Sequence, residues 1–161
     1  MAEQTSAVVP SHPPERLLRA VNPLLRRLLR TPLAGAARKQ LMVLTFTGRK
    51  SGRQYSIPVS AHWIDGDLYA LAGAGWKANF SGGRSAEVLY DGKSTTMRGE
   101  LIKDPAVVAD LYHRCALSYG ATRAQRMIGL KFTVPGIPTL EQFRAAVDAN
   151  GLAAIRFAGT G

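Results

Sequence analysis

Short apolar segments separated by glycine-containing turns fill the middle of the sequence, and this pattern constrains the fold more than any other feature. The segments predicted as strands are Leu41–Thr47, Gln54–Ile64, Leu68–Gly73, Ala86–Tyr90 and Ser94–Ile102. The links Asp65-Gly66-Asp67 and Asp91-Gly92 are strong hairpin signals, because Asp-Gly supplies the positive φ angles of tight turns. The pattern therefore predicts an antiparallel meander, in which Pro58 is confined to an edge strand or a bulge.

Helical signals follow the last of these strands. Asp104 is a good N-cap and Pro105 suits the first helical position, while Thr139 and Gln142 form a capping box. The predicted helices cover 105–118, 121–128 and 139–150, and a final strand covers Leu152–Phe157. Strands in a row followed by helices predict a mainly β fold, a small closed or split barrel with flanking helices.

The chain is expected to divide into three parts: a disordered N-terminal tail over 1–13, a basic amphipathic helix with its linker over 14–35, and a β-barrel domain with peripheral helices over 36–161. In the second part, leucines recur on one arc of a helix and arginines occupy the opposite arc. Such a helix packs its leucines on the domain, or it lies on an anionic membrane with its arginines on the headgroups.

The net charge of +10 implies an acidic partner. Three classes fit: a phosphorylated or polycarboxylate small molecule, an anionic membrane, and a nucleic acid. The nucleic acid is disfavoured, because aromatic residues make up 7% of the chain and are not interleaved with the basic ones as a stacking platform requires.

The single cysteine, Cys115, excludes an internal disulfide and a cysteine-built zinc or iron–sulfur site within one chain, and no metal-binding motif is present. No apolar run reaches the ~20 residues that span a bilayer, and the polar residues 1–14 do not resemble a secretory signal. We therefore expect a cytoplasmic protein, peripheral on the inner face of the plasma membrane if the basic helix binds lipid.

The turn Thr47-Gly48-Arg49-Lys50-Ser51-Gly52-Arg53 is the most distinctive local sequence. It places three cations and a hydroxyl between flexible glycines, directly after a strand. Backbone N–H groups in such a turn can form an anion-binding concavity, to which Arg and Lys add charge-assisted hydrogen bonds. The alternative is a solvated β-turn. A Walker loop is excluded by the glycine spacing.

The sequence contains no clear acid–base pair. This favours an enzyme in which a cofactor does the chemistry while the protein orients it, and it fits a pure binding module equally well.

Two ordered blocks resemble the deazaflavin-dependent nitroreductase family. The first runs from Leu44 through Gly52 to Pro58-Val59, and the second joins Asp65–Tyr69 to Gly75–Phe80, with its Trp-x-x-Asn turn. The resemblance covers about residues 16–105. It implies a split antiparallel β-barrel of the FMN-binding, pyridoxamine-oxidase-like type. It also implies binding of reduced coenzyme F420 and hydride transfer to a quinone, a nitroaromatic or another electron-poor small molecule.

Carried over by position, the resemblance implies the following site. The coenzyme's phosphate and oligoglutamate tail fall to Arg49, Lys50 and Ser51, and Gly52 and Arg53 also belong to the cofactor site. The ring falls to Pro58, Val59, Ser60, Ala72, Gly73 and Ala74, and the phosphate end to Trp76 and Asn79. We expect Ser60, Tyr112 or Tyr119 to deliver a proton or to orient the substrate. The alternative is that these side chains only line the site.

Two positions depart from the family pattern. Tyr55 stands where many members of that family have an arginine, and the nearby Arg53 is a substitute for it. The loop over 72–76 is shorter than in those proteins and lacks the lysine that it often supplies there. Three alternatives therefore stay open: an FMN-dependent relative, a non-catalytic F420 carrier, and a lipid or fatty-acid carrier on the same fold. The sequence sets no oligomeric state.

Overall fold

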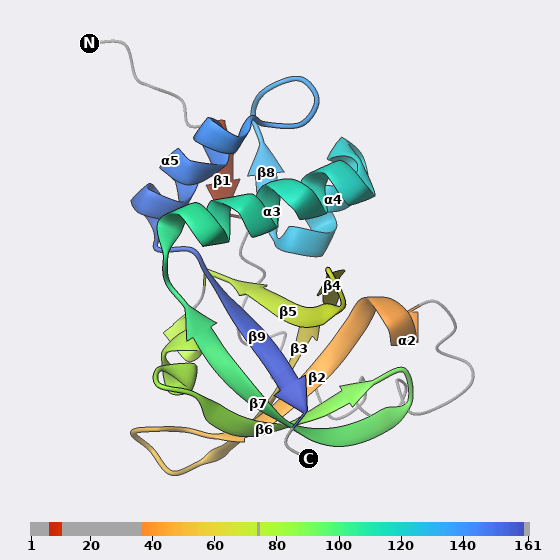
Figure 1. Cartoon of the computed structure of the whole chain (residues 1–161), viewed down its shortest axis with the longest axis vertical. Helices are drawn as coiled ribbons and strands as arrows, with labels where there is room; N and C mark the ends of the chain where they lie inside the picture. Colours follow the sequence, from red (N-terminus) through yellow and green to blue (C-terminus); the bar gives the residue numbers. More distant parts are fainter. Residues whose placement is uncertain (1–6, 11–36, 74, 160–161) are drawn as a thin grey trace. The chain divides into compact units, whose positions relative to one another are not determined.

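The computed structural model describes residues 7–10, 37–73 and 75–159 (Figure 1). Its strands are β1 Val8–Pro10, β2 Leu41–Thr47, β3 Gln54–Ser60, β4 His62–Ile64, β5 Asp67–Ala72, β6 Arg84–Tyr90, β7 Lys93–Ile102, β8 Leu130–Phe132 and β9 Ala153–Gly159. Its helices are α2 Ala37–Gln40, the 3-10 helix η2 Gly75–Phe80, α3 Pro105–Tyr119, α4 Ala121–Ile128 and α5 Leu140–Asn150.

The described residues form two compact units. Unit 1 contains 7–10, Leu71–Lys77 and Ile102–Ala154. Unit 2 contains 37–70, Ala78–Leu101 and 155–159.

Unit 2 holds most of a seven-stranded antiparallel sheet that curls into a half-barrel. The strand order is β3-β2-β6-β7-β9-β5-β4. Strand β2 pairs with β3 on one side and β6 on the other, and it is buried from Met42 to Phe46. These findings confirm the predicted fold class, a mainly β fold with flanking helices and an antiparallel, barrel-like sheet.

The predicted strand Gln54–Ile64 is two strands, β3 and β4, which lie at opposite edges of the sheet. Ala61 alone separates them, and its N–H donates to the carbonyl oxygen of Gln40 at 2.9 Å. Two edges can be joined by one residue only if the sheet curls until they approach each other. The rings of Trp63 on β4 and Tyr90 on β6 accordingly lie 5.7 Å apart. Pro58 lies on an edge strand, as predicted.

Unit 1 packs its helices around aromatic side chains. Phe143 of α5 is fully buried and lies 6.5 Å from the Tyr112 ring of α3 and 5.8 Å from the Phe132 ring of β8. Strand β8 pairs with β1, with Val9 opposite Lys131. Neither strand is predicted from the sequence, and β1 falls within the tail over 1–13 that is expected to be disordered. Each strand has three residues, too short to show periodicity.

Both predicted caps are confirmed. The Asp104 carboxylate accepts from the N–H of Ala106 at 3.0 Å at the start of α3. At the start of α5, Thr139 Oγ1 accepts from the N–H of Gln142 at 3.2 Å, and the Gln142 side chain accepts from the N–H of Thr139 at 2.8 Å.

None of the helices in the described part of the chain combines the length and the apolar composition that crossing a membrane requires. The predicted basic amphipathic helix and its linker, 14–35, lie outside the described residues.

The capping box of α5 gives a first prediction. Replacing Thr139 by alanine should lower the free energy of unfolding by about 1 kcal/mol, because one helix N–H loses its acceptor. Thr139→Ser keeps the hydroxyl and should be nearly neutral. Urea unfolding followed by circular dichroism measures both variants, and an equal loss in the two would show that the threonine acts through its methyl group.

Candidate functional site

The basic turn joins β2 to β3 at one end of a fully registered hairpin, where Thr47 pairs with Gln54. The turn is closed by its own backbone. The N–H of Gly48 donates to the carbonyl of Arg53 at 2.6 Å, and the N–H of Gly52 donates to the carbonyl of Gly48 at 3.0 Å. Gly52 adopts a φ of 68°, which a glycine accepts without strain.

Most of the turn's N–H groups are already engaged, contrary to the expectation of a backbone anion-binding concavity. Besides the two above, the N–H of Arg49 donates to Asn79 Oδ1 at 2.7 Å and that of Arg53 to Ser51 Oγ at 3.2 Å. The N–H groups of Gly48, Arg49, Gly52 and Arg53 thus all have acceptors among the described residues. An anion would therefore be recognised mainly by side chains.

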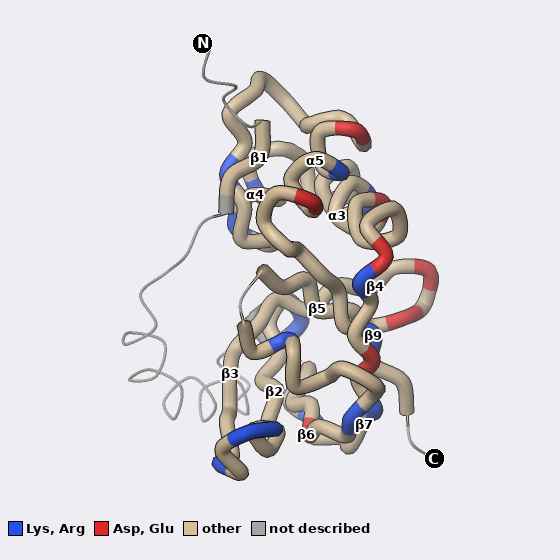
Figure 2. The backbone as a smooth tube through the Cα atoms, turned by 90° about the vertical axis from the view of Figure 1, so that its left-hand side faces the viewer, with Lys and Arg blue, Asp and Glu red and all other residues tan. Residues whose placement is uncertain are grey.

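The turn's cationic side chains, those of Arg49, Lys50 and Arg53, are exposed. Figure 2 shows the blue segments between β2 and β3. Among the described residues, none of the three forms an ion pair with a carboxylate. Arg49 makes one long contact, from Nη1 to the carbonyl of Ala78 at 3.4 Å. The turn thus presents positive charge that the described part of the protein does not neutralise.

Tyr55 braces the turn from inside. Its hydroxyl shares a hydrogen bond of 3.1 Å with Ser51 Oγ, and its ring lies 6.0 Å from that of Phe46. An added Cβ on Gly48 would lie 2.6 Å from both the Tyr55 ring and Ser51 Oγ, so only glycine fits there. Tyr55 therefore has a structural role in this turn.

Asn79 reaches the turn because Phe80, the next residue, anchors the end of η2. Phe80 is fully buried, with its ring 5.2 Å from Phe46 and 5.8 Å from Phe157. A Cβ added to Gly99 would lie 2.6 Å from the Phe80 ring, so the ring occupies the space over that glycine. Sequence reasoning missed Gly99, although an isolated glycine within a strand is a signal of such a close approach.

The predicted ring-binding residues of unit 2 lie on the edge strand β3. Pro58, Val59 and Ser60 are all half-buried, and they pair with Val43, Met42 and Leu41 of β2. Since β3 is the outermost strand, these residues have a sheet neighbour on one side only. They share one hairpin with the basic turn.

The other predicted ring-binding positions fall in unit 1. Ala72 ends β5 and is buried. Gly73 is exposed, and a Cβ added to it would lie 3.0 Å from the Leu152 side chain. Trp76 is half-buried in η2. Ala74 lies outside the described residues.

The two predicted tyrosines differ in accessibility. Tyr112 is 1% exposed in the core of unit 1, and burial raises the pKa of its phenol above the ordinary range. It therefore has no route to a substrate in this structure. Tyr119 is half-buried, and the guanidinium carbon of Arg123 lies 5.2 Å from its ring centre.

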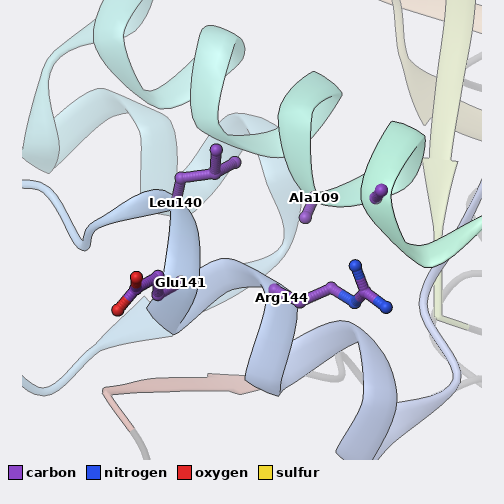
Figure 3. A pocket seen from close by; sticks show the side chains of 5 residues that line it. Ala109, Leu140, Glu141 and Arg144 are labelled. Carbon is purple, nitrogen blue, oxygen red and sulfur yellow. The ribbon is translucent and has the colours of Figure 1, made fainter.

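A pocket of about 280 Å³ opens between the first turns of α3 and α5 (Figure 3). It is lined by Ala106, Ala109, Leu140, Glu141 and Arg144. Leu140 points toward α3, while Glu141 and Arg144 extend in different directions. None of the residues predicted for the site lines this pocket.

Comparison with models of known protein families finds no match, and comparison with curated proteins finds none either.

The crowding around Gly48 gives a second prediction. Gly48→Ala should lower the free energy of unfolding by about 1–3 kcal/mol, because the new methyl group must displace Tyr55 or Ser51. Gly75→Ala is the matched control: an added Cβ there meets nothing within 4 Å, so a change within about 0.5 kcal/mol is expected. Chemical denaturation measures both variants. A neutral Gly48→Ala would show that the turn rearranges freely.

The buried thiol gives a third prediction. Burial raises the pKa of Cys115 from 9.0 to about 12, so at pH 8 the folded protein holds almost no thiolate. A thiol reagent should therefore modify Cys115 slowly in the native protein and rapidly in urea. The unfolded thiol loses its proton first, so the free energy of unfolding should fall as the pH rises above 9.0 toward 12. Rapid native labelling at pH 8 would contradict this account.

Proposed function

We propose that this protein is a deazaflavin (F420H2)-dependent oxidoreductase that transfers a hydride to a quinone, a nitroaromatic or another electron-poor acceptor. One observation carries the proposal. A braced turn presents three cations that have no carboxylate partner among the described residues, on the same hairpin as a half-buried apolar edge strand. A coenzyme with a phosphate, several carboxylates and a flat ring needs both features.

The side chains present fit such an anion. Arg49 and Arg53 offer forked guanidinium groups, Lys50 an ammonium, and Ser51 a hydroxyl, all anchored by a turn whose backbone is already hydrogen-bonded. Because the backbone of the turn is fixed before an anion arrives, little backbone conformational entropy would be lost on binding. When bound, the coenzyme would supply the hydride.

On the apolar side, Pro58 and Val59 are the residues of unit 2 assigned to the ring. Ser60 follows them on the same strand and is half-buried, so we assign its hydroxyl to orienting the acceptor. Positioning is expected to dominate in this chemistry, which explains the lack of an acid–base pair. Tyr112 takes no part in the proposal, because its side chain is buried.

We place the protein in the cytoplasm, with contact to the inner face of the plasma membrane through the 14–30 segment. That contact would bring the protein close to quinones in the membrane, and quinones are among the proposed acceptors.

The coenzyme test uses the full-length protein. Titration with oxidised F420, followed by its fluorescence, should show saturable binding in the micromolar range. Lys50→Gln should weaken binding by about ten- to a hundredfold, because a charge-assisted contact contributes roughly 1.5–3 kcal/mol. Lys93→Gln removes an exposed lysine from β7 of the same unit and should change the affinity little. Equal effects of the two substitutions would argue for a nonspecific charge effect.

Turnover is measured separately, as loss of reduced F420 on addition of menadione. Binding with turnover supports the reductase. Binding without turnover would make the protein a coenzyme carrier. Absence of binding at micromolar F420, with FMN co-purifying instead, would replace the proposal by an FMN-dependent function.

A further inference from the structure

The described acidic residues of unit 1 are confined to two of its helices and the residue before one of them. These acidic side chains lie on α3 or α5 or directly before α3: Asp104, Asp110, Glu141 and Asp148. Between Asp110 and Glu141 the sequence contains no acidic residue at all. That stretch forms the end of α3, α4 and β8, and Figure 2 shows blue segments gathered around α4.

Besides Arg114, which pairs with Asp110, three cations of this stretch are exposed: Arg123, Arg126 and Lys131. Arg123 and Arg126 are three residues apart on α4, so they lie on one side of the helix, and the buried Ile128 lies on the opposite side. Phe132 of β8 donates its N–H to the side chain of Gln125 at 2.9 Å, which holds the strand against α4.

None of these three cations forms an ion pair with any described carboxylate. Elsewhere in unit 1, Arg114 pairs with Asp110 at 3.0 Å and Arg144 with Asp148 at 3.5 Å. Like charges one helical turn apart repel each other. A ligand with several negative charges would relieve that repulsion.

Two apolar side chains, one at the end of α3 and one on β1, are also exposed. Leu117, in the last turn of α3, is 58% exposed. Val9 is 39% exposed and pairs with Lys131 across β1 and β8. We call these two residues, with Arg123, Arg126 and Lys131, the basic face.

We propose that the basic face docks on an anionic phospholipid surface. Exposed leucine and valine beside arginine and lysine suit the boundary between headgroups and acyl chains, where apolar side chains enter and cations meet phosphates. A nucleic acid would instead favour an open aromatic ring for stacking, and the guanidinium of Arg123 covers the ring of Tyr119 at 5.2 Å. This surface is distinct from the 14–30 segment, and it does not depend on the reductase function.

The experiment is sedimentation of the full-length protein with vesicles of phosphatidylglycerol and phosphatidylcholine, and with phosphatidylcholine alone. Binding is expected to the anionic vesicles only. Arg126→Gln with Lys131→Gln should lower the vesicle affinity by about tenfold or more, since each cation near such a surface contributes roughly 1 kcal/mol. Lys39→Gln with Lys93→Gln removes the same charge from exposed positions of unit 2 and is the control.

The apolar part of the basic face is tested with a second matched pair. Leu117→Ser should lower vesicle affinity, whereas Leu140→Ser, at a leucine that is 45% exposed on α5, should not. Circular dichroism of each variant checks the fold. Equal losses in the test and control pairs would overturn the proposal and place the contact elsewhere, for example in the 14–30 segment. Binding of an RNA oligonucleotide with the same dependence on Arg126 and Lys131, without vesicle binding, would also overturn it.

Discussion

Packing of the Phe80 ring over Gly99 is the contact on which the candidate site depends. The ring occupies space that any other residue at position 99 would fill, and it meets Phe46 and Phe157 at the same time. Phe80 is the last residue of η2, so its burial fixes Asn79, whose side chain accepts from the N–H of Arg49. A buried aromatic contact thus sets the position of an exposed cationic turn.

The same contacts decide what kind of anion site the turn can offer. A loose glycine-rich loop would bind an anion through its N–H groups, and most of those groups are engaged here with Arg53, Gly48, Asn79 and Ser51. Selectivity among anions then depends on long side chains, which can reach several charged groups at once but do not form one tight binding site. That arrangement suits an extended ligand with a phosphate and several carboxylates better than a compact inorganic phosphate.

Sequence reasoning succeeded where the information is local. The bounds of β2 and α4, the Asp104 cap and the Thr139 capping box depend on residues within a few positions of each other. It failed where partners lie far apart in the chain. Gln54–Ile64 reads as one strand, because nothing local shows that Ala61 carries the chain from one sheet edge to the other. The bracing role of Tyr55 and the need for a glycine at 99 likewise depend on side-chain contacts that no motif encodes.

The net charge of +10 indicated an acidic partner without saying where it binds. The structure shows which of the cations have carboxylate partners. Arg114, Arg144 and Arg156 have them, whereas neither the basic turn of unit 2 nor the basic face of unit 1 has any among the described residues. The two surfaces also differ in their apolar neighbours, a half-buried edge strand in one case and exposed Leu117 and Val9 in the other. A flat ring with an anionic tail fits the first, and a lipid surface fits the second. On these two proposals one excess of positive charge serves two different anions, and the apolar surface beside each cluster distinguishes the partners.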